Sequence, residues 1–243
     1  MKVTHHGQNL IQLTRLGAFS CYFVREEDEL TLVDTNLFGS AKAILEAARR
    51  EQLPITRLVL THAHGDHAGS LDKISELLPG LEIAFTARTA RFLEGDLSLT
   101  ADEPQAKLRG DFVRRQTKPT RLLTPGDQIG SLQVIAAPGH TPDHIAFLDT
   151  RDGTLIGGDA FQSQAGLAVA GTLRWLFPFP AMATWHPQTA LDTARQLRRL
   201  NPSRLAVGHG KVIDNPTQAM DRAIAEAEQN LAKRQHHQKI VHG

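Results

Sequence analysis

The sequence predicts an α/β protein in which two β-sheets are covered by helices on their outer faces. Short β-rich runs alternate with segments of helix-forming residues along nearly the whole 243-residue chain, a pattern typical of layered α/β folds. Several of these runs end beside a glycine and a His or Asp. No linker-like stretch interrupts the chain between the first candidate site residue, His62, and the last, His209. We therefore expect a single domain spanning residues 1–243.

The strand-like runs are short, apolar or β-branched, and bounded by turn residues. They lie at residues 11–16, 20–24, 30–34, 57–60, 81–85, 121–123, 132–136, 144–148, 154–158 and 204–208. The helical segments lie at residues 41–52, 71–78, 87–94, 188–200 and 216–234. Residues that favour helix boundaries support these limits, such as Ser40 as a candidate N-cap and Pro216 in a first turn.

Composition is that of an ordinary globular protein, with 41% hydrophobic and 22% charged residues. The net charge of +1 gives no electrostatic reason to expect a nucleic-acid partner. No segment is apolar for long enough to be a signal-peptide core or a membrane span. Cys21 is the only cysteine, which excludes an intrachain disulfide and a cysteine-based zinc site. We expect a cytoplasmic protein with a small-molecule substrate and neither nucleic-acid nor membrane partners.

The most informative motif is a loop that carries four potential metal ligands directly after the apolar run 58–60. The ligands are His62, His64, Asp66 and His67. Side chains that leave a strand through a short glycine-containing loop can converge on one point, whereas on a continuous helix these positions would diverge. Imidazole and carboxylate groups hold catalytic zinc while leaving a coordination position open. The alternative is a polar loop with surface histidines, but the preceding buried strand favours a metal site.

Three further residues of the same kind follow strand-like runs later in the chain. His140 follows the run at 132–136, Asp159 follows the run at 154–158, and His209 follows the run at 204–208. Adjacent glycines allow the sharp turns and close backbone approach that a crowded metal centre requires. Each residue alone is a weak signal, but together with the 62–67 loop they supply enough ligands for two metal ions.

These residues resemble the metallo-β-lactamase-fold hydrolases. The resemblance rests on the H-x-H-x-D-H motif, the Gly-His-Thr at 139–141, Asp159 after a Gly-Gly pair, the late Gly-His at 208–209, and Asp34 at an early strand end. It extends from about residue 11 to residue 213 and implies an αββα four-layer sandwich. It also implies two divalent metal ions, with zinc favoured and iron or manganese as alternatives. One ion would be held by His62, His64 and His140, the other by Asp66, His67 and His209, with Asp159 bridging the two.

The resemblance also implies the chemistry. A metal-bridging hydroxide would attack a carbonyl carbon, and Asp66 would orient it and carry a proton as the catalytic residue. Metal-bound imidazoles need partners for their other nitrogens, and Asp34, Thr141 and Asp143 are candidates. His144 is expected to support the site or pack on a strand rather than to bind metal.

The expected activity is hydrolysis of a small carboxylic ester, lactone or thioester. Asp159 argues against antibiotic hydrolysis, because β-lactamases of this fold do not place an aspartate at the bridging position. Acyl-homoserine lactonases are similar in length and ligands, but many have a tyrosine where this chain has Gln162. The short C-terminal region argues against a glyoxalase II. The alternatives are an oxidoreductase similar to the mononuclear iron persulfide dioxygenases and a non-catalytic ligand-binding protein.

Two segments without regular patterning are expected to shape the substrate pocket. Residues 95–120 are rich in charge and predict either a substrate-contacting lid or a solvated loop. Residues 161–187 are rich in aromatic side chains and predict an apolar pocket wall or the interface of a homodimer. The prolines at 178 and 180 argue against a regular helix there. The candidate pocket residues are Phe161, Gln162, Trp175, Phe177 and Phe179.

Overall fold

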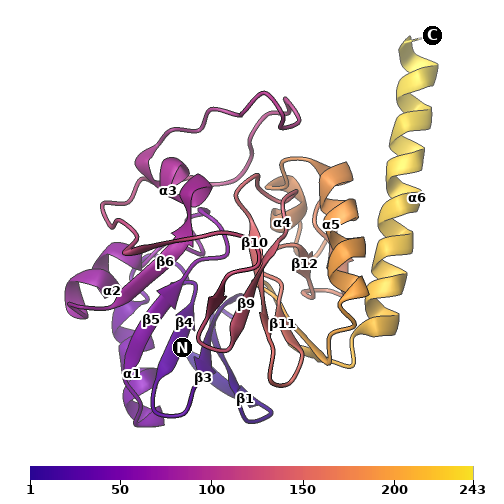
Figure 1. Ribbon diagram of the computed structural model, residues 1–243. Helices are drawn as coiled ribbons and strands as arrows, with labels where there is room; N and C mark the ends of the chain where they lie inside the picture. The colour runs from indigo at the N-terminus through magenta and orange to yellow at the C-terminus, as the bar shows by residue number, and fades with distance from the viewer. Residues whose placement is uncertain (243) are drawn as a thin grey trace.

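The computed structural model describes the backbone of residues 1–242 and the side chains of residues 1–234. Two β-sheets lie face to face in the middle of the molecule, and helices cover both outer faces (Figure 1). The first sheet contains, in spatial order, β1 (Lys2–His6), β2 (Leu10–Arg15), β3 (Phe19–Arg25), β4 (Leu30–Val33), β5 (Ile55–Val59), β6 (Glu82–Thr86) and β7 (Arg121–Leu123). The second contains β15 (Ile213–Asp214), β14 (Arg204–Ala206), β11 (Thr154–Ile156), β10 (Ile145–Asp149), β9 (Leu132–Ala136) and β8 (Gln128–Ile129).

The helices divide between the two outer faces. The first sheet carries α1 (Ala41–Glu51), α2 (Leu71–Leu77) and α3 (Ala87–Glu94), and the second carries α5 (Pro187–Arg199) and α6 (Thr217–His242). Local chemistry fixes their ends. The side chain of Thr86 accepts a hydrogen bond from the Thr89 amide to begin α3, and His186 does the same for α5, where Pro187 occupies the first turn.

Three apolar cores correspond to the three contacts between these four layers. One joins the first sheet to α1, α2 and α3, and includes Leu32 and Ile44. A second joins the second sheet to α5 and α6, and includes Leu205. The third lies between the sheets, where Tyr22 of β3 and Phe147 of β10 are buried. This arrangement is the αββα sandwich that the sequence predicted.

Strand direction brings the site residues to one edge of the sandwich. β4 runs parallel to β5, so Asp34 and the loop beginning at residue 60 leave the first sheet at the same end. β11 runs parallel to β14, so Asp159 and His209 leave the second sheet together. The two sheets are joined at this edge by the amide of Ile145, which donates to the carbonyl of Thr61 at 2.9 Å.

Several short elements were not expected from the sequence. β1 and the two-residue strands β8, β12 (Phe161–Gln162), β13 (Ala168–Val169) and β15 carry too little periodicity to be recognised. The helical turn α4 (Phe179–Met182) corrects the expectation that prolines exclude a helix, because Pro180 lies in the first turn, where no amide donor is needed. Ser40 precedes α1 but its side chain does not cap the helix; its hydroxyl accepts from Arg15 instead.

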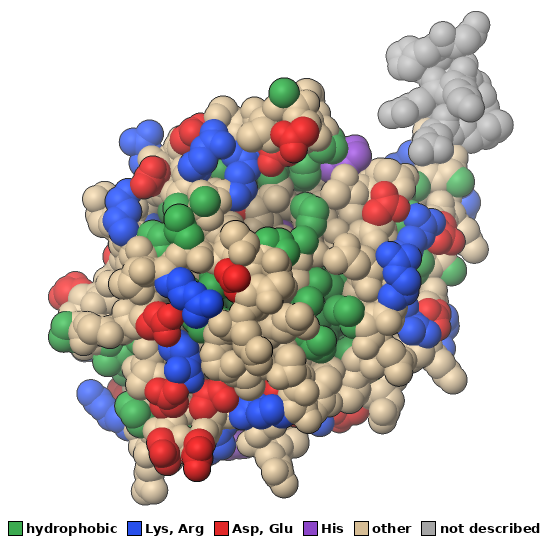
Figure 2. Space-filling view, in the orientation of Figure 1, with side chains coloured by type: hydrophobic (Ala, Val, Ile, Leu, Met, Phe, Trp, Pro, Cys, Tyr) green, Lys and Arg blue, Asp and Glu red, His purple; other side chains and the backbone are tan. Residues whose placement is uncertain are grey.

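No helix among the described residues is both long and apolar enough to cross a membrane. Acidic and basic side chains are interspersed on the face seen in Figure 2 rather than gathered into patches of one sign, in keeping with the small net charge.

Candidate metal centre

The first group of ligands comprises three buried histidines whose ring nitrogens face one another. Nδ1 of His64 lies 3.2 Å from Nε2 of His62 and 3.1 Å from Nε2 of His140. His62 and His64 come from the loop after β5, and His140 comes from the turn after β9. All three side chains are almost completely buried. Their nitrogens lie within 4.8 Å of one another, the spacing of a metal-binding group.

Hydrogen bonds on the far side of each ring fix which nitrogen carries the proton. Nε2 of His64 donates to the Arg109 carbonyl at 2.9 Å, so its Nδ1 is bare. The Thr61 hydroxyl donates to Asp34, so it can only accept from Nδ1 of His62, at 3.0 Å.

The hydroxyl of Thr184 is likewise used as a donor, to the carbonyl of Pro180 at 2.7 Å. It therefore accepts from Nδ1 of His140 at 3.2 Å. All three rings present an unprotonated nitrogen to the same point.

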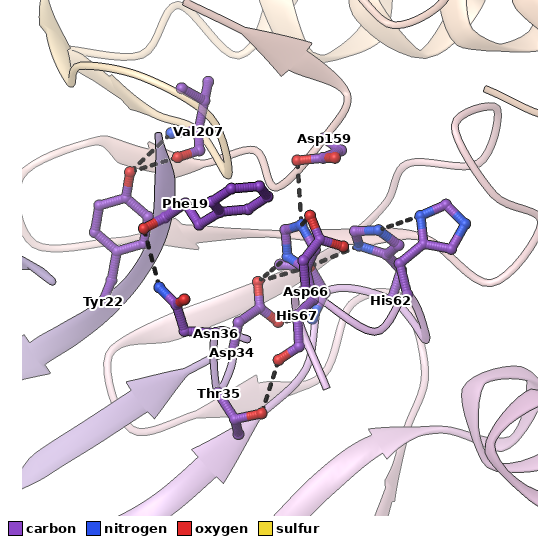
Figure 3. Close-up of polar contacts among 12 residues, drawn as sticks. Phe19, Tyr22, Asp34, Thr35, Asn36, His62, Asp66, His67, Asp159 and Val207 are labelled. Carbon is purple, nitrogen blue, oxygen red and sulfur yellow. Dashed lines mark hydrogen bonds and ion pairs between the residues drawn. The ribbon is translucent and has the colours of Figure 1, made fainter. Parts of the chain in front are cut away.

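The second group comprises His67, Asp66 and His209, with Asp159 between the two groups. Nε2 of His209 lies 3.2 Å from Asp66 Oδ2 and 3.0 Å from Asp159 Oδ2. Nε2 of His67 lies 3.3 Å from Asp159 Oδ1, and Nε2 of His140 lies 3.4 Å from Asp159 Oδ2. In Figure 3 the His67 ring lies between the carboxylates of Asp34 and Asp159. Asp159 thus contacts histidines of both groups.

The two groups have opposite electrostatic character. Burial and neighbouring imidazoles hold the pKa of His62 and of His140 well below the usual value, so both rings are neutral. Burial alone would also lower the pKa of His209, but the carboxylates of Asp159 and Asp66 raise it to about 9. Burial opposes ionisation of Asp66, but His67 and His209 lower its pKa well below the usual range.

A divalent cation fits this donor set. Three bare imidazole nitrogens that face one another at about van der Waals distance repel unless a positive charge lies among them. Beside the second group, the ionised carboxylates of Asp66 and Asp159 are balanced only by protons on histidines. Oδ1 of Asp159 is buried without a hydrogen-bond partner among the described residues, as expected of an atom that binds metal. The cluster therefore has the composition and geometry of a divalent metal site.

A cavity of about 320 Å³ opens beside the ligands. One wall carries the apolar side chains Phe19, Phe179, Pro180, Met182 and Ala183. The lining also includes Gly110 and Asp111, and ligands from both groups. Such a cavity matches a small ligand held mainly by apolar contacts.

Most of the expected pocket residues lie outside the cavity lining. Phe161 lies in the core beneath α5 and α6, and Gln162 is buried beside it, because the pair forms β12 rather than the cavity wall. Trp175 is 86% exposed and does not line the cavity. Phe177 packs against two residues of the lining, Phe19 and Phe179, and its ring lies 5.3 Å from that of His209. Phe179 is the one of the five that lines the cavity. Whether this segment meets a second subunit stays a prediction.

Residues around the ligands partly match the sequence-based expectations. Asp34 lies where it was expected and accepts a hydrogen bond from Nδ1 of His67 at 2.8 Å. Thr141 and Asp143 do not bond a site imidazole in the described part of the chain. His144 supports the site, because its Nε2 accepts from the Asp159 amide at 3.0 Å.

Segment 95–120 reaches the site through residues 109–112. The amide of Gly65 donates to the Asp111 carbonyl at 2.8 Å, and the Phe112 ring packs 4.6 Å from that of His64. Sequence reasoning missed this contact, as it missed the roles of the Arg109 carbonyl and of Thr184. None of these positions belongs to a periodic pattern. The only sequence signal near them is the Gly110-Asp111 pair, which is typical of a turn.

A sequence profile of the metallo-β-lactamase superfamily matches residues 15–209. The chain belongs to this superfamily. It is 47% identical over 231 residues to the uncharacterized protein YobT of Bacillus subtilis, covering 93% of this chain and 99% of that protein. It is 29% identical over 176 residues to a hydroxyacylglutathione hydrolase of Xanthomonas campestris, covering 69% of this chain and 57% of that enzyme.

Solved structures show the same superfamily fold. A metallo-β-lactamase from Pontibacter korlensis superimposes with a TM-score of 0.69 at 16% identity, covering 93% of this chain and 98% of the other. TTHA1623 in a di-iron-bound form superimposes with a TM-score of 0.62 at 24% identity, covering 86% and 96%.

Proposed function

We propose that this chain is a dinuclear metal hydrolase of small carboxylic esters, lactones or thioesters, with zinc as the favoured metal. The observation that carries the proposal is the pair of ligand groups that share Asp159 at the floor of a largely apolar cavity. His62, His64 and His140 would hold one ion, and Asp66, His67 and His209 the other. A relative named hydroxyacylglutathione hydrolase supports acyl transfer to water as the reaction class.

Bound divalent ions would acidify a water and polarise the carbonyl oxygen of the substrate. The chain itself supplies positioning and proton transfer. Among the carboxylates of the two ligand groups, that of Asp66 is the most accessible, with 23% side-chain exposure, and it lines the cavity. It can therefore take a proton from the attacking water and pass it to the leaving group. Phe179 and Met182 would contact the apolar part of the substrate and exclude bulk water.

Metal analysis combined with a substrate panel tests this proposal. The purified protein should contain close to two equivalents of metal per chain. His140→Ala and His209→Ala should each remove about one equivalent, because each takes a ligand from a different group. His5→Ala is the matched control, because His5 is exposed and pairs with Glu51 far from the site. The loaded protein should hydrolyse at least one of an aryl ester, a lactone and a thioester.

The outcome that contradicts the proposal is equally specific. One equivalent of iron, retained in His209→Ala, together with oxidation of a persulfide and no hydrolysis, would identify the mononuclear oxidoreductase instead.

A further inference from the structure

Asp111 is the one charged side chain of the cavity lining that is not among the candidate metal ligands. The lining contains three carboxylates, and two of them, Asp66 and Asp159, belong to the ligand groups. Asp111 is exposed toward the cavity and forms no ion pair with any of the described residues. Its carboxylate is therefore free to meet a bound molecule.

The backbone around Asp111 is held tightly against the ligand loop. Its carbonyl accepts from the Gly65 amide at 2.8 Å, and the carbonyl two residues earlier accepts from His64 at 2.9 Å. On the other side Phe112 packs between the rings of His64 and Phe92, at 4.6 and 5.1 Å. Contacts on both sides fix the Cα of Asp111, and its short side chain leaves the carboxylate little freedom to move away.

Two glycines make this close approach possible. Gly110 has a φ of +91°, and a Cβ there would lie 2.2 Å from Nε2 of His64. A Cβ at Gly65 would lie 2.7 Å from the Asp111 carboxylate itself. Gly110 is thus restricted to glycine, and a side chain at Gly65 would displace the Asp111 carboxylate. The carboxylate lies directly over the backbone of the H-x-H-x-D-H motif.

No lysine or arginine lines the cavity, although segment 95–120 is rich in them. Arg115 instead donates to the Ala68 carbonyl, and the guanidinium of Arg114 packs over Gly95. Apart from the ligand histidines and the ions that they would hold, a substrate carboxylate would find no cationic partner in this lining, and it would meet Asp111 there. A substrate with an ammonium group, or with amide or hydroxyl donors, would find an acceptor.

We infer that Asp111 selects substrates by charge, so that the site takes cationic or neutral donor-bearing acyl compounds in preference to anionic ones. This inference rests on the proposed hydrolase function and deepens it. Anionic thioesters and carboxylate-bearing lactams are disfavoured among the candidate substrates. Neutral lactones with an amide donor and esters of amino alcohols are favoured.

Three acetyl thioesters of similar length whose thiols differ in charge test the inference, with each rate compared with that of the uncatalysed hydrolysis. The thiols are 2-(dimethylamino)ethanethiol, N-acetylcysteamine and 3-mercaptopropionate, which are cationic, neutral and anionic. With the zinc-loaded enzyme, kcat/KM should be at least about tenfold higher for the cation than for the anion, since a fixed charge acts on the two in opposite directions. D111N should lower this ratio severalfold, and D111K should lower it further, because each substitution makes the lining less negative. Asp102→Asn, an exposed carboxylate of the same segment outside the lining, is the matched control.

Different outcomes would contradict the role of Asp111 and the proposed hydrolase function. Hydrolysis of all three thioesters with the same charge ratio in the enzyme and in D111N overturns the role of Asp111 and leaves the hydrolase intact. No hydrolysis of these thioesters, or of an ester or lactone, overturns the hydrolase itself. Metal content and melting temperature of D111N should match those of the unsubstituted protein, because the side chain is exposed and contributes no ligand.

Discussion

Replacing Asp34 by Asn tests whether the hydrogen bonds behind the ligands set their metal affinity. The substitution is isosteric and compatible with the backbone, because Asp34 has a φ of 63° and Asn tolerates this left-handed region. Asp34 is 2% exposed, and its carboxylate accepts three hydrogen bonds of 2.8 Å each. The donors are the amide and hydroxyl of Thr61 and Nδ1 of His67.

The amide that replaces the carboxylate can be oriented in only one way. Its oxygen must stay opposite the Thr61 backbone N–H, which cannot rearrange. Its NH₂ group then faces Nδ1 of His67, donor against donor. His67 can relieve this conflict only by moving its proton to Nε2, the atom 3.3 Å from Asp159 that would bind metal. A protonated Nε2 cannot be a ligand.

The expected result is a 10–100-fold loss of metal affinity, the usual effect of removing such a partner, which corresponds to about 1.4–2.8 kcal/mol. Titration of the zinc-loaded protein with a competing chromophoric chelator measures it. Asp149→Asn is the matched control, because Asp149 is equally buried but pairs with Arg151 at the end of β10 that lies away from the site. It should lose stability without losing metal affinity. A D34N protein that holds zinc within twofold of the original would refute the tautomer argument.

Three further predictions follow from other contacts. Asp159→Ala should lower metal content and abolish turnover together, whereas Asp66→Asn should reduce turnover more than metal content; equal, mild effects would contradict both roles. Phe179→Ala should shift the chain-length preference among acyl substrates. An unchanged preference together with a lower melting temperature would show that Phe179 only packs in the fold and does not contact substrate. Tyr22→Phe should lose about 2–4 kcal/mol of unfolding free energy in urea titrations, because the buried hydroxyl satisfies both the amide and carbonyl of Val207; a loss below 1 kcal/mol would contradict this.

The ligand positions could be predicted because they follow from local patterns. The pattern is an apolar run of four or five residues that is followed by a glycine and a His or Asp, and it can be read directly from the sequence. Parallel pairing of the strands then brings the C-terminal ends of these runs together. Asp159 and His209 were placed in this way, whereas Asp34 was expected from the resemblance to the family. Element boundaries agree with the structure to within one or two residues for most strands and helices, and differ most at α6, which extends to His242.

The cavity wall could not be predicted because it depends on contacts between distant segments. Phe161 and Phe179 belong to the same aromatic stretch, yet one forms a short strand in the core and the other begins a helical turn at the cavity. Nothing in the local pattern distinguishes them. The strand pairing of Phe161 with Val169, two residues of β12 and β13, decides the difference, and so short a ladder has no recognisable period.

The ligands and the cavity wall therefore depend on different parts of the chain. The ligands leave strands or the turns directly after them, and the hydrogen bonds of Asp34 and Thr61 orient them within the rigid sandwich. Most of the wall is built from the segments around Asp111 and Phe179, which touch the ligands through backbone and hydroxyl hydrogen bonds and through the rings of Phe112 and Phe177. Loops that pack on a fixed scaffold can change sequence without disturbing it. Substitutions in these two segments should thus alter which substrate is accepted while the metal centre keeps its geometry. Thr184 is the exception, since its hydroxyl joins the wall to His140.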